Sequence, residues 1–182
     1  RNEALVEGVG QLLDRDGLIL GICNGFQALV KLGLVPYGKI VEPRPEAPTL
    51  TFNRIGRHQS SIVRVRVENT SSPWLAGVKP GEVYSVPISH GEGRFHVSDQ
   101  DLQAMIAGGQ IATRYVDLAG EPTMDIAANP NGSVAAIEGI TSPDGRVFGK
   151  MGHAERIGAN LYRNVPGRYD MRLFESAVAY LG

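Results

Sequence analysis

The one cysteine of the chain, Cys23, stands in a pattern that suits a catalytic nucleophile. It is the centre of Gly21-Ile22-Cys23-Asn24-Gly25, the thiol form of the G-x-S-x-G elbow. In such an elbow a strained turn between a strand and a helix lifts the nucleophile above the sheet, and flanking glycines let the two elements pass closely. The helix that begins at Asn24 directs its N-terminus at the sulfur, which favours a thiolate and offers N–H groups to an oxyanion. The alternative, from these five residues alone, is a buried and unreactive cysteine.

A cysteine nucleophile needs a histidine base and a carboxylate that orients the base. The sequence offers two such pairs. Glu155 follows His153 by two residues where the chain leaves a predicted strand, and residues i and i+2 of an extended segment face the same way. Glu92 follows His90 with the same spacing at the end of another predicted strand. Spacing alone leaves both pairs open, and the alternative for each is a chance pair in a solvated loop or turn.

The elements that would position these residues are those of an α/β domain. The apolar run over 18–22 is typical of a strand buried on both faces of a parallel sheet, and the apolar spacing over 24–32 predicts the helix after the nucleophile. Alternating apolar and charged residues over 61–68 indicate a strand with one wet face. We therefore expect a mostly parallel central sheet with helices on both faces and an antiparallel excursion in the middle. The further predicted elements are helices over 3–13, 98–107 and 169–180, and strands over 82–89, 110–116, 134–139 and 147–151.

Composition and charge exclude several classes of function. The 182 residues suit one domain, which we place over 1–182, and the formal net charge of −1 gives no field that would attract nucleic acid or an anionic membrane. No apolar run approaches the ~18 residues that span a bilayer, and residues 1–10 lack a secretory signal pattern. One cysteine allows no internal disulfide, so a cytoplasmic setting fits. We find no phosphate-binding glycine loop, and we assign no metal and no cofactor to this chain.

Three motifs, in this order, resemble one known family. They are Gly21-Ile22-Cys23-Asn24-Gly25-Phe26-Gln27, Ile88-Ser89-His90-Gly91-Glu92-Gly93-Arg94-Phe95 and Met151-Gly152-His153-Ala154-Glu155-Arg156. Together they resemble the class I (triad) glutamine amidotransferase domain of phosphoribosylformylglycinamidine synthase, and most of all the C-terminal domain of its large fused form. The resemblance spans essentially the whole chain and implies a class I glutamine amidotransferase-like, flavodoxin-like fold. The second and third motifs are far more specific than the first.

The resemblance implies that Cys23 is the nucleophile, His153 the base and Glu155 the orienting carboxylate of a glutaminase. It implies hydrolysis of glutamine through a cysteine thioester. The ammonia would pass to a synthetase domain of the same enzyme, which uses ATP and Mg²⁺ in purine biosynthesis. Substrate-binding roles are implied for residues of the first two motifs, namely Gly21, Asn24, Gln27, His90 and Glu92.

Two departures from the family pattern qualify this interpretation. Position 154 is Ala where many members have Pro. The family also has a first strand and a glycine-rich oxyanion loop, at a distance before the cysteine that exceeds the 22 residues present here. We therefore expect a piece of a longer polypeptide that lacks this strand and loop and is inactive alone. The alternatives are a stand-alone cysteine hydrolase or peptidase-like enzyme, and a catalytically incomplete structural or regulatory module.

Overall fold

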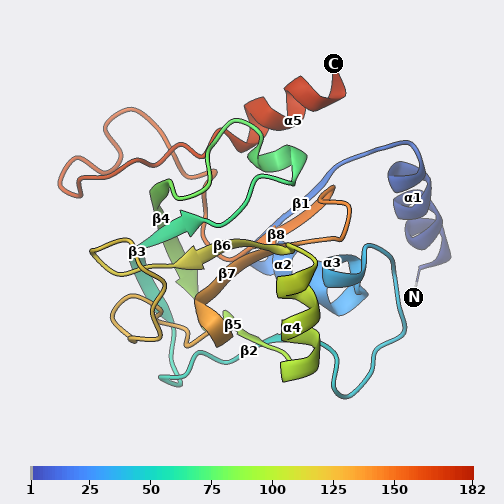
Figure 1. The fold of residues 1–182 in the computed structure, drawn as a ribbon, viewed down its shortest axis with the longest axis horizontal. Coiled ribbons are helices and arrows are strands. Elements are labelled where there is room, and N and C mark those ends of the chain that lie inside the picture. The colour runs from blue at the N-terminus through green and yellow to red at the C-terminus, as the bar shows by residue number, and fades with distance from the viewer. Residues whose placement is uncertain (1) are drawn as a thin grey trace.

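The computed structural model describes residues 2–182. Its central feature is a six-stranded sheet with helices packed against it, and a separate two-stranded sheet lies beside it (Figure 1). The helices are α1 (Glu3–Asp14), α2 (Asn24–Leu32), α3 (Leu34–Tyr37), α4 (Asp99–Ala107), α5 (Leu173–Leu181), and the 3₁₀ turns η1 (Pro73–Leu75) and η2 (Val134–Ala136). The strands are β1 (Ile19–Ile22), β2 (Thr49–Thr51), β3 (Gln59–Val67), β4 (Val83–His90), β5 (Arg94–His96), β6 (Ile111–Tyr115), β7 (Ile137–Thr141) and β8 (Val147–Lys150).

The large sheet is mixed, with the strand order β1-β8-β7-β6-β3-β4. Within residues 2–182 only the β1–β8 pairing is parallel, and the other four neighbours pair antiparallel. The α/β class is confirmed, but the expectation of a mostly parallel sheet is wrong for these strands. For β7 and β8 the physical reason is connection length, because parallel neighbours need a long crossover. The short turn over 142–146 allows β7 and β8 only an antiparallel pairing.

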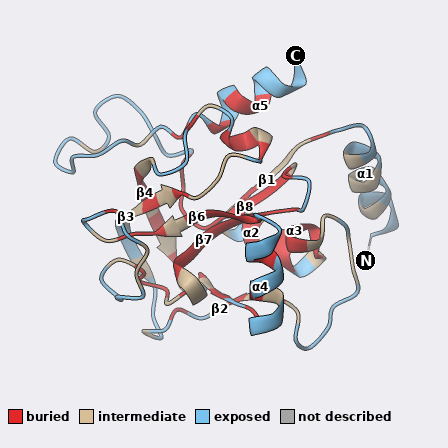
Figure 2. Ribbon diagram, viewed as in Figure 1, coloured by how far each residue is buried: buried red, intermediate tan, exposed pale blue. Residues whose placement is uncertain are grey.

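Helices lie on both faces of the sheet, as predicted. The core on one face includes Phe26 and Leu29 of α2, Leu34 of α3 and Met105 of α4. The core on the other face includes residues of η1 and α5 together with the apolar side of β3 and β4. Figure 2 shows the buried residues gathered along the strands and on the inward sides of these helices. By contrast, α1 has no buried residue and lies at one edge of the molecule (Figure 1).

Local sequence accounts for several element boundaries. Helix α2 ends at Gly33, whose φ of 83° is a left-handed conformation that glycine adopts without strain. Helix α4 begins where the Ser98 hydroxyl accepts a hydrogen bond from the N–H of Asp101. Two predictions differ from the structure, and one pair of strands has no counterpart among the predictions. Residues 134–136 form η2 before β7, α5 begins at Leu173 instead of residue 169, and the β2–β5 pair was not predicted.

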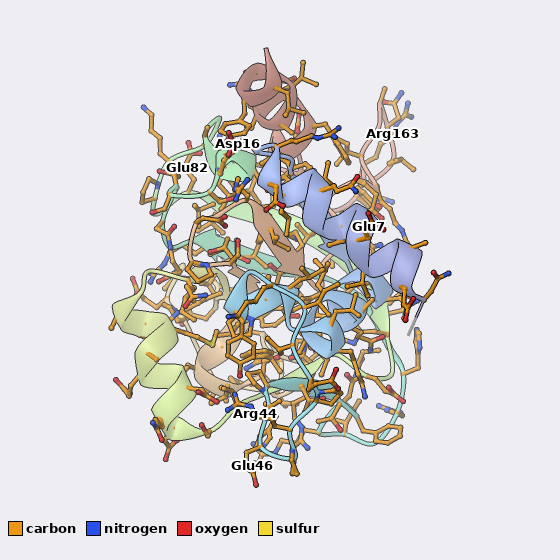
Figure 3. The ribbon with its side chains drawn as sticks, turned by 90° about the vertical axis from the view of Figure 1, so that its right-hand side faces the viewer. Glu7, Asp16, Arg44, Glu46, Glu82 and Arg163 are labelled. Atoms are coloured by element: carbon orange, nitrogen blue, oxygen red, sulfur yellow. The ribbon has the colours of Figure 1, made fainter. Side chains whose placement is uncertain are left out.

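Most charged side chains lie on the outside of the molecule. Figure 3 shows Glu7 on α1, Arg44 and Glu46 on the loop after α3, and Arg163 on the loop before α5, and all four residues are exposed. Across the part of the chain that the structure describes, no helix has both the length and the apolar character needed to cross a bilayer.

Candidate active site

Cys23 sits in a strained turn between β1 and α2. Its φ of 54° and ψ of −107° are unusual for a residue with a Cβ, and the main chain holds it there. The Cys23 N–H donates to the carbonyl of Lys150 over 2.8 Å, and the N–H of Gln27 donates to the Cys23 carbonyl over 3.1 Å. The thiol is half-buried, with Sγ 3.9 Å from the Ser89 carbonyl oxygen. The predicted strand–turn–helix elbow is therefore present.

The two glycines around Cys23, Gly21 and Gly25, differ in how closely they are packed. A Cβ on Gly21 would lie 2.7 Å from the backbone of Gly25 and 2.5 Å from a methyl group of Leu29, so β1 and α2 approach closely only without it. Among the described residues, no atom beyond its chain neighbours and the backbone of its own helix lies within 4 Å of the Cβ position of Gly25. The prediction that both glycines permit close passage is thus confirmed at Gly21 and wrong at Gly25. The structure gives Gly21 a packing role, and its substrate-binding role stays a prediction.

Burial sets the resting state of the thiol. It raises the pKa of Cys23 above its ordinary value, and nearby Glu155 raises that pKa further. The N–H of Asn24 and the charge of Arg156 lower the pKa, but they do not outweigh burial. The N-terminal end of α2 therefore lowers the pKa of the Cys23 thiol, as predicted, but the pKa remains raised overall. A thiol of this kind needs a base before it can attack.

His153 follows β8, at the same end of the sheet where β1 leads into Cys23. The strands are parallel neighbours with Ile22 opposite Lys150, so the residues that follow them leave at the same edge. His153 is 8% exposed, and its N–H donates to the Pro87 carbonyl over 2.8 Å. This hydrogen bond fixes the main chain of His153 at the end of the sheet where β1 leads into Cys23.

Glu155 reaches back to this imidazole. Nδ1 of His153 lies 2.6 Å from Oε1 of Glu155, as the i, i+2 spacing predicted. An ionised carboxylate only accepts hydrogen bonds, so Nδ1 carries the proton and Nε2 is free to act as a base. The Glu155 side chain is 35% exposed, and Arg156 Nε lies 3.7 Å from the same oxygen.

The rival pair, His90 and Glu92, does not form a comparable unit. Nδ1 of His90 faces Oδ1 of Asn53 at 3.1 Å, and Nε2 is buried without a hydrogen-bond partner among residues 2–182. Burial lowers the pKa of His90 to about 4, with the nearby His58 as the next cause. The Glu92 side chain is exposed, while its carbonyl accepts a 2.5 Å hydrogen bond from Nε2 of Gln27. Geometry therefore favours the His153–Glu155 pair as base and orienter.

Of the predicted substrate-binding residues, Gln27 on α2 and Glu92 on the loop after β4 meet directly. His90 is the last residue of β4 and is buried, whereas Asn24 is exposed at the start of α2. The loop thus closes over the helix that follows the nucleophile. Substrate contact by these residues stays a prediction.

Asn53 is a residue that sequence analysis missed. Its Nδ2 donates to the carbonyls of His90 and Arg57 over 2.8 and 3.0 Å, which turns Oδ1 towards the N–H of Gly93 at 3.1 Å. Asn131 adds a 2.7 Å hydrogen bond to the Gly93 carbonyl. These buried amides fix the loop over 90–93. The turn over 129–133 was a visible signal for the second amide, but no local pattern marks Asn53.

A hollow of about 580 Å³ lies elsewhere, between β3 and the loop over 116–128. It is lined by residues such as Ile62 and Leu118 and contains none of the predicted site residues. We place the active site at Cys23, because the site is defined by convergent chemical groups and the hollow has no comparable set.

An α/β sheet whose parallel edge presents a strained cysteine beside a histidine–glutamate pair is the arrangement of a hydrolase that works by acyl transfer. The family model of the CobB/CobQ-like glutamine amidotransferase domain matches residues 1–181. The chain is 38% identical over 177 residues to the phosphoribosylformylglycinamidine synthase subunit PurQ of Symbiobacterium thermophilum. This alignment covers 97% of this chain and 68% of that subunit. It is 37% identical to PurQ of Gloeobacter violaceus over 98% of this chain and 70% of the relative.

A solved structure of PurLQS from Thermotoga maritima superposes with a TM-score of 0.72 at 29% identity, covering 98% of this chain and 68% of that one. The chain therefore belongs to the CobB/CobQ-like glutamine amidotransferases, in the family of PurQ subunits of phosphoribosylformylglycinamidine synthase. It spans about two thirds of the length of the two PurQ subunits.

Proposed function

We propose that this chain hydrolyses glutamine and supplies the ammonia to the synthetase component of phosphoribosylformylglycinamidine synthase. The observation that supports this most is the 2.6 Å bond between His153 and Glu155, at the sheet edge where Cys23 stands in its strained turn. The family membership supports glutamine as the substrate, because the relatives are glutamine amidotransferase subunits of this enzyme.

In the proposed mechanism Nε2 of His153 takes the proton of the Cys23 thiol, and the sulfur attacks the side-chain amide carbon of glutamine. The carbonyl oxygen becomes an oxyanion, which the backbone N–H of Asn24 stabilises at the start of α2. His153 returns the proton to the nitrogen, the C–N bond breaks and ammonia leaves. A water molecule, deprotonated by His153, attacks the thioester and releases glutamate with the thiol restored. Glu155 stabilises the imidazolium that forms in both steps.

By the same resemblance, ATP and Mg²⁺ belong to the synthetase component, and the reaction takes place in the cytoplasm. The T. maritima structure contains PurL and PurS together with PurQ, which supports a synthetase partner for this chain. The curated relatives are separate PurQ subunits, while similarity to the C-terminal domain of the large fused form stays a prediction. The alternatives of a stand-alone hydrolase or an incomplete module are not favoured by these relatives.

The test is Cys23→Ser in the full enzyme that contains this chain. We expect glutamine-dependent synthesis to be abolished and ammonia-dependent synthesis to be retained, because only the first reaction uses the thiol. Glutamine-dependent turnover that survives the substitution would refute the proposal. Labelling with a glutamine-mimicking electrophile provides a second readout: it should modify Cys23 and be prevented by glutamine.

A further inference from the structure

Lys150 and Glu138 form a charged pair in the centre of the sheet. Lys150 Nζ lies 3.0 Å from Oε1 of Glu138, and both side chains are 0% exposed. Among the Asp, Glu, Lys and Arg residues in 2–182, these two alone are buried. Removing two charges from water is costly, and a buried pair often adds nothing to stability compared with apolar residues of similar size. The position of the pair therefore calls for another explanation.

Both charged groups clamp a single residue, Gly152. Oε1 of Glu138 accepts the Gly152 N–H over 2.6 Å, and Nζ of Lys150 donates to the Gly152 carbonyl over 2.8 Å. The second carboxylate oxygen of Glu138 accepts the hydroxyl of Thr113 over 2.5 Å, which anchors the clamp to β6. A Cβ on Gly152 would lie 2.9 Å from Glu138 Oε1 and 2.6 Å from Val86 Cγ2, so glycine is what lets the carboxylate approach.

The clamp lies between the nucleophile and the base. Gly152 directly precedes His153, and glycine would otherwise give this turn wide conformational freedom. The carbonyl of Lys150 accepts the N–H of Cys23 over 2.8 Å. Lys150 therefore contacts Cys23 through its main chain and the residue before His153 through its side chain.

We infer that Lys150 and Glu138 are positioning residues, which hold His153 in register with Cys23 through the Gly152 peptide groups. The inference rests on the proposed function, because it concerns the same base and nucleophile. Neither side chain need touch the substrate for this role. Catalysis depends on placing reacting groups to within a fraction of an ångström, and misplacement by about 1 Å costs on the order of 100-fold in rate.

The experiment replaces the pair by Glu138→Met with Lys150→Met in the full enzyme. Two apolar side chains of similar length keep the core filled and leave no unpaired charge. We expect kcat of glutamine-dependent synthesis to fall about 10- to 100-fold, with KM for glutamine changed less than about threefold. Ammonia-dependent synthesis should stay near wild type, because it does not depend on the register of His153. Tm should fall, because the Gly152 N–H and carbonyl and the Thr113 hydroxyl lose their buried partners. Labelling of Cys23 by a glutamine-mimicking electrophile should slow in parallel with kcat.

A second variant, Glu138→Gln with Lys150→Met, keeps an acceptor for the Gly152 N–H and should lose less kcat than the Met pair. It supplies the readout if the Met pair does not fold. The control is Arg66→Gln with Glu68→Gln, which removes a 2.9 Å pair at the end of β3, outside the site, and should leave kcat unchanged. Wild-type kcat in a folded variant that lacks both charges overturns the inference, as does a loss of both activities in proportion to Tm. Cys23→Ser, assayed in parallel, tests the proposed function separately. Glutamine-dependent turnover that survives this substitution would refute the proposed function, whatever the results for the Glu138 and Lys150 variants.

Discussion

Replacing Glu155 by Gln should lower kcat of the glutamine-dependent reaction and leave the ammonia-dependent reaction unchanged. The new side chain would be nearly isosteric, and its carbonyl could still accept the Nδ1 proton of His153, so the tautomer survives while the negative charge is lost. A hydrogen bond to a charged group contributes about 1.5–3 kcal/mol. The bond here is short, at 2.6 Å, but the Glu155 side chain is 35% exposed and water screens part of its charge.

This screening places the expected loss near the lower limit, about 1.5–2 kcal/mol, which is about a 10- to 30-fold fall in kcat. The assay compares steady-state synthesis with glutamine and with ammonia in the same preparation. Glu175→Gln on α5 is the matched control, because Glu175 pairs with Arg172 at the surface and its side chain is 62% exposed. A kcat within twofold of wild type would show that Glu155 does not support the imidazolium, and the proposed roles of His153 and Glu155 would have to be abandoned.

Two further predictions concern the frame of the site. Gly21→Ala should destabilise the protein by about 1–3 kcal/mol, because the new Cβ would meet the backbone of Gly25. Gly25→Ala meets no such neighbour and should destabilise the protein clearly less. Urea unfolding midpoints compare the two variants, and equal midpoints would contradict the packing argument. His90 should make stability fall with acid. Its pKa is lowered from 6.5 to about 4, so the folded state resists protonation, and stability that is complete above pH 6.5 should decline towards pH 4 by up to about 3 kcal/mol. Urea unfolding at pH 7 and pH 4 measures this decline, and His90→Gln should reduce it; an equal decline in the variant would show that other groups cause it.

The strand and helix around the nucleophile were predictable because their signals are local. The apolar run over 18–22 and the helical spacing after it lie within a few residues of Cys23, and β1 and α2 follow them closely. Sheet direction was not predictable in this way. β6 pairs antiparallel with both β3 and β7, and the long stretches of chain between these strands allow either direction, so the strand segments contain no such information.

The sequence by itself determined the candidate chemical groups of this protein: a cysteine in an elbow, and two histidines that each have a glutamate two residues away. Only the tertiary structure distinguished the two pairs. It placed His153 after β8, the strand parallel to β1, and hydrogen-bonded it to Glu155, while it enclosed His90 against Asn53. The physical reason is that a base is defined by its distance from other groups and by its burial. Both quantities depend on residues far away in the chain, such as Asn53 for His90 and Pro87, whose carbonyl accepts the N–H of His153.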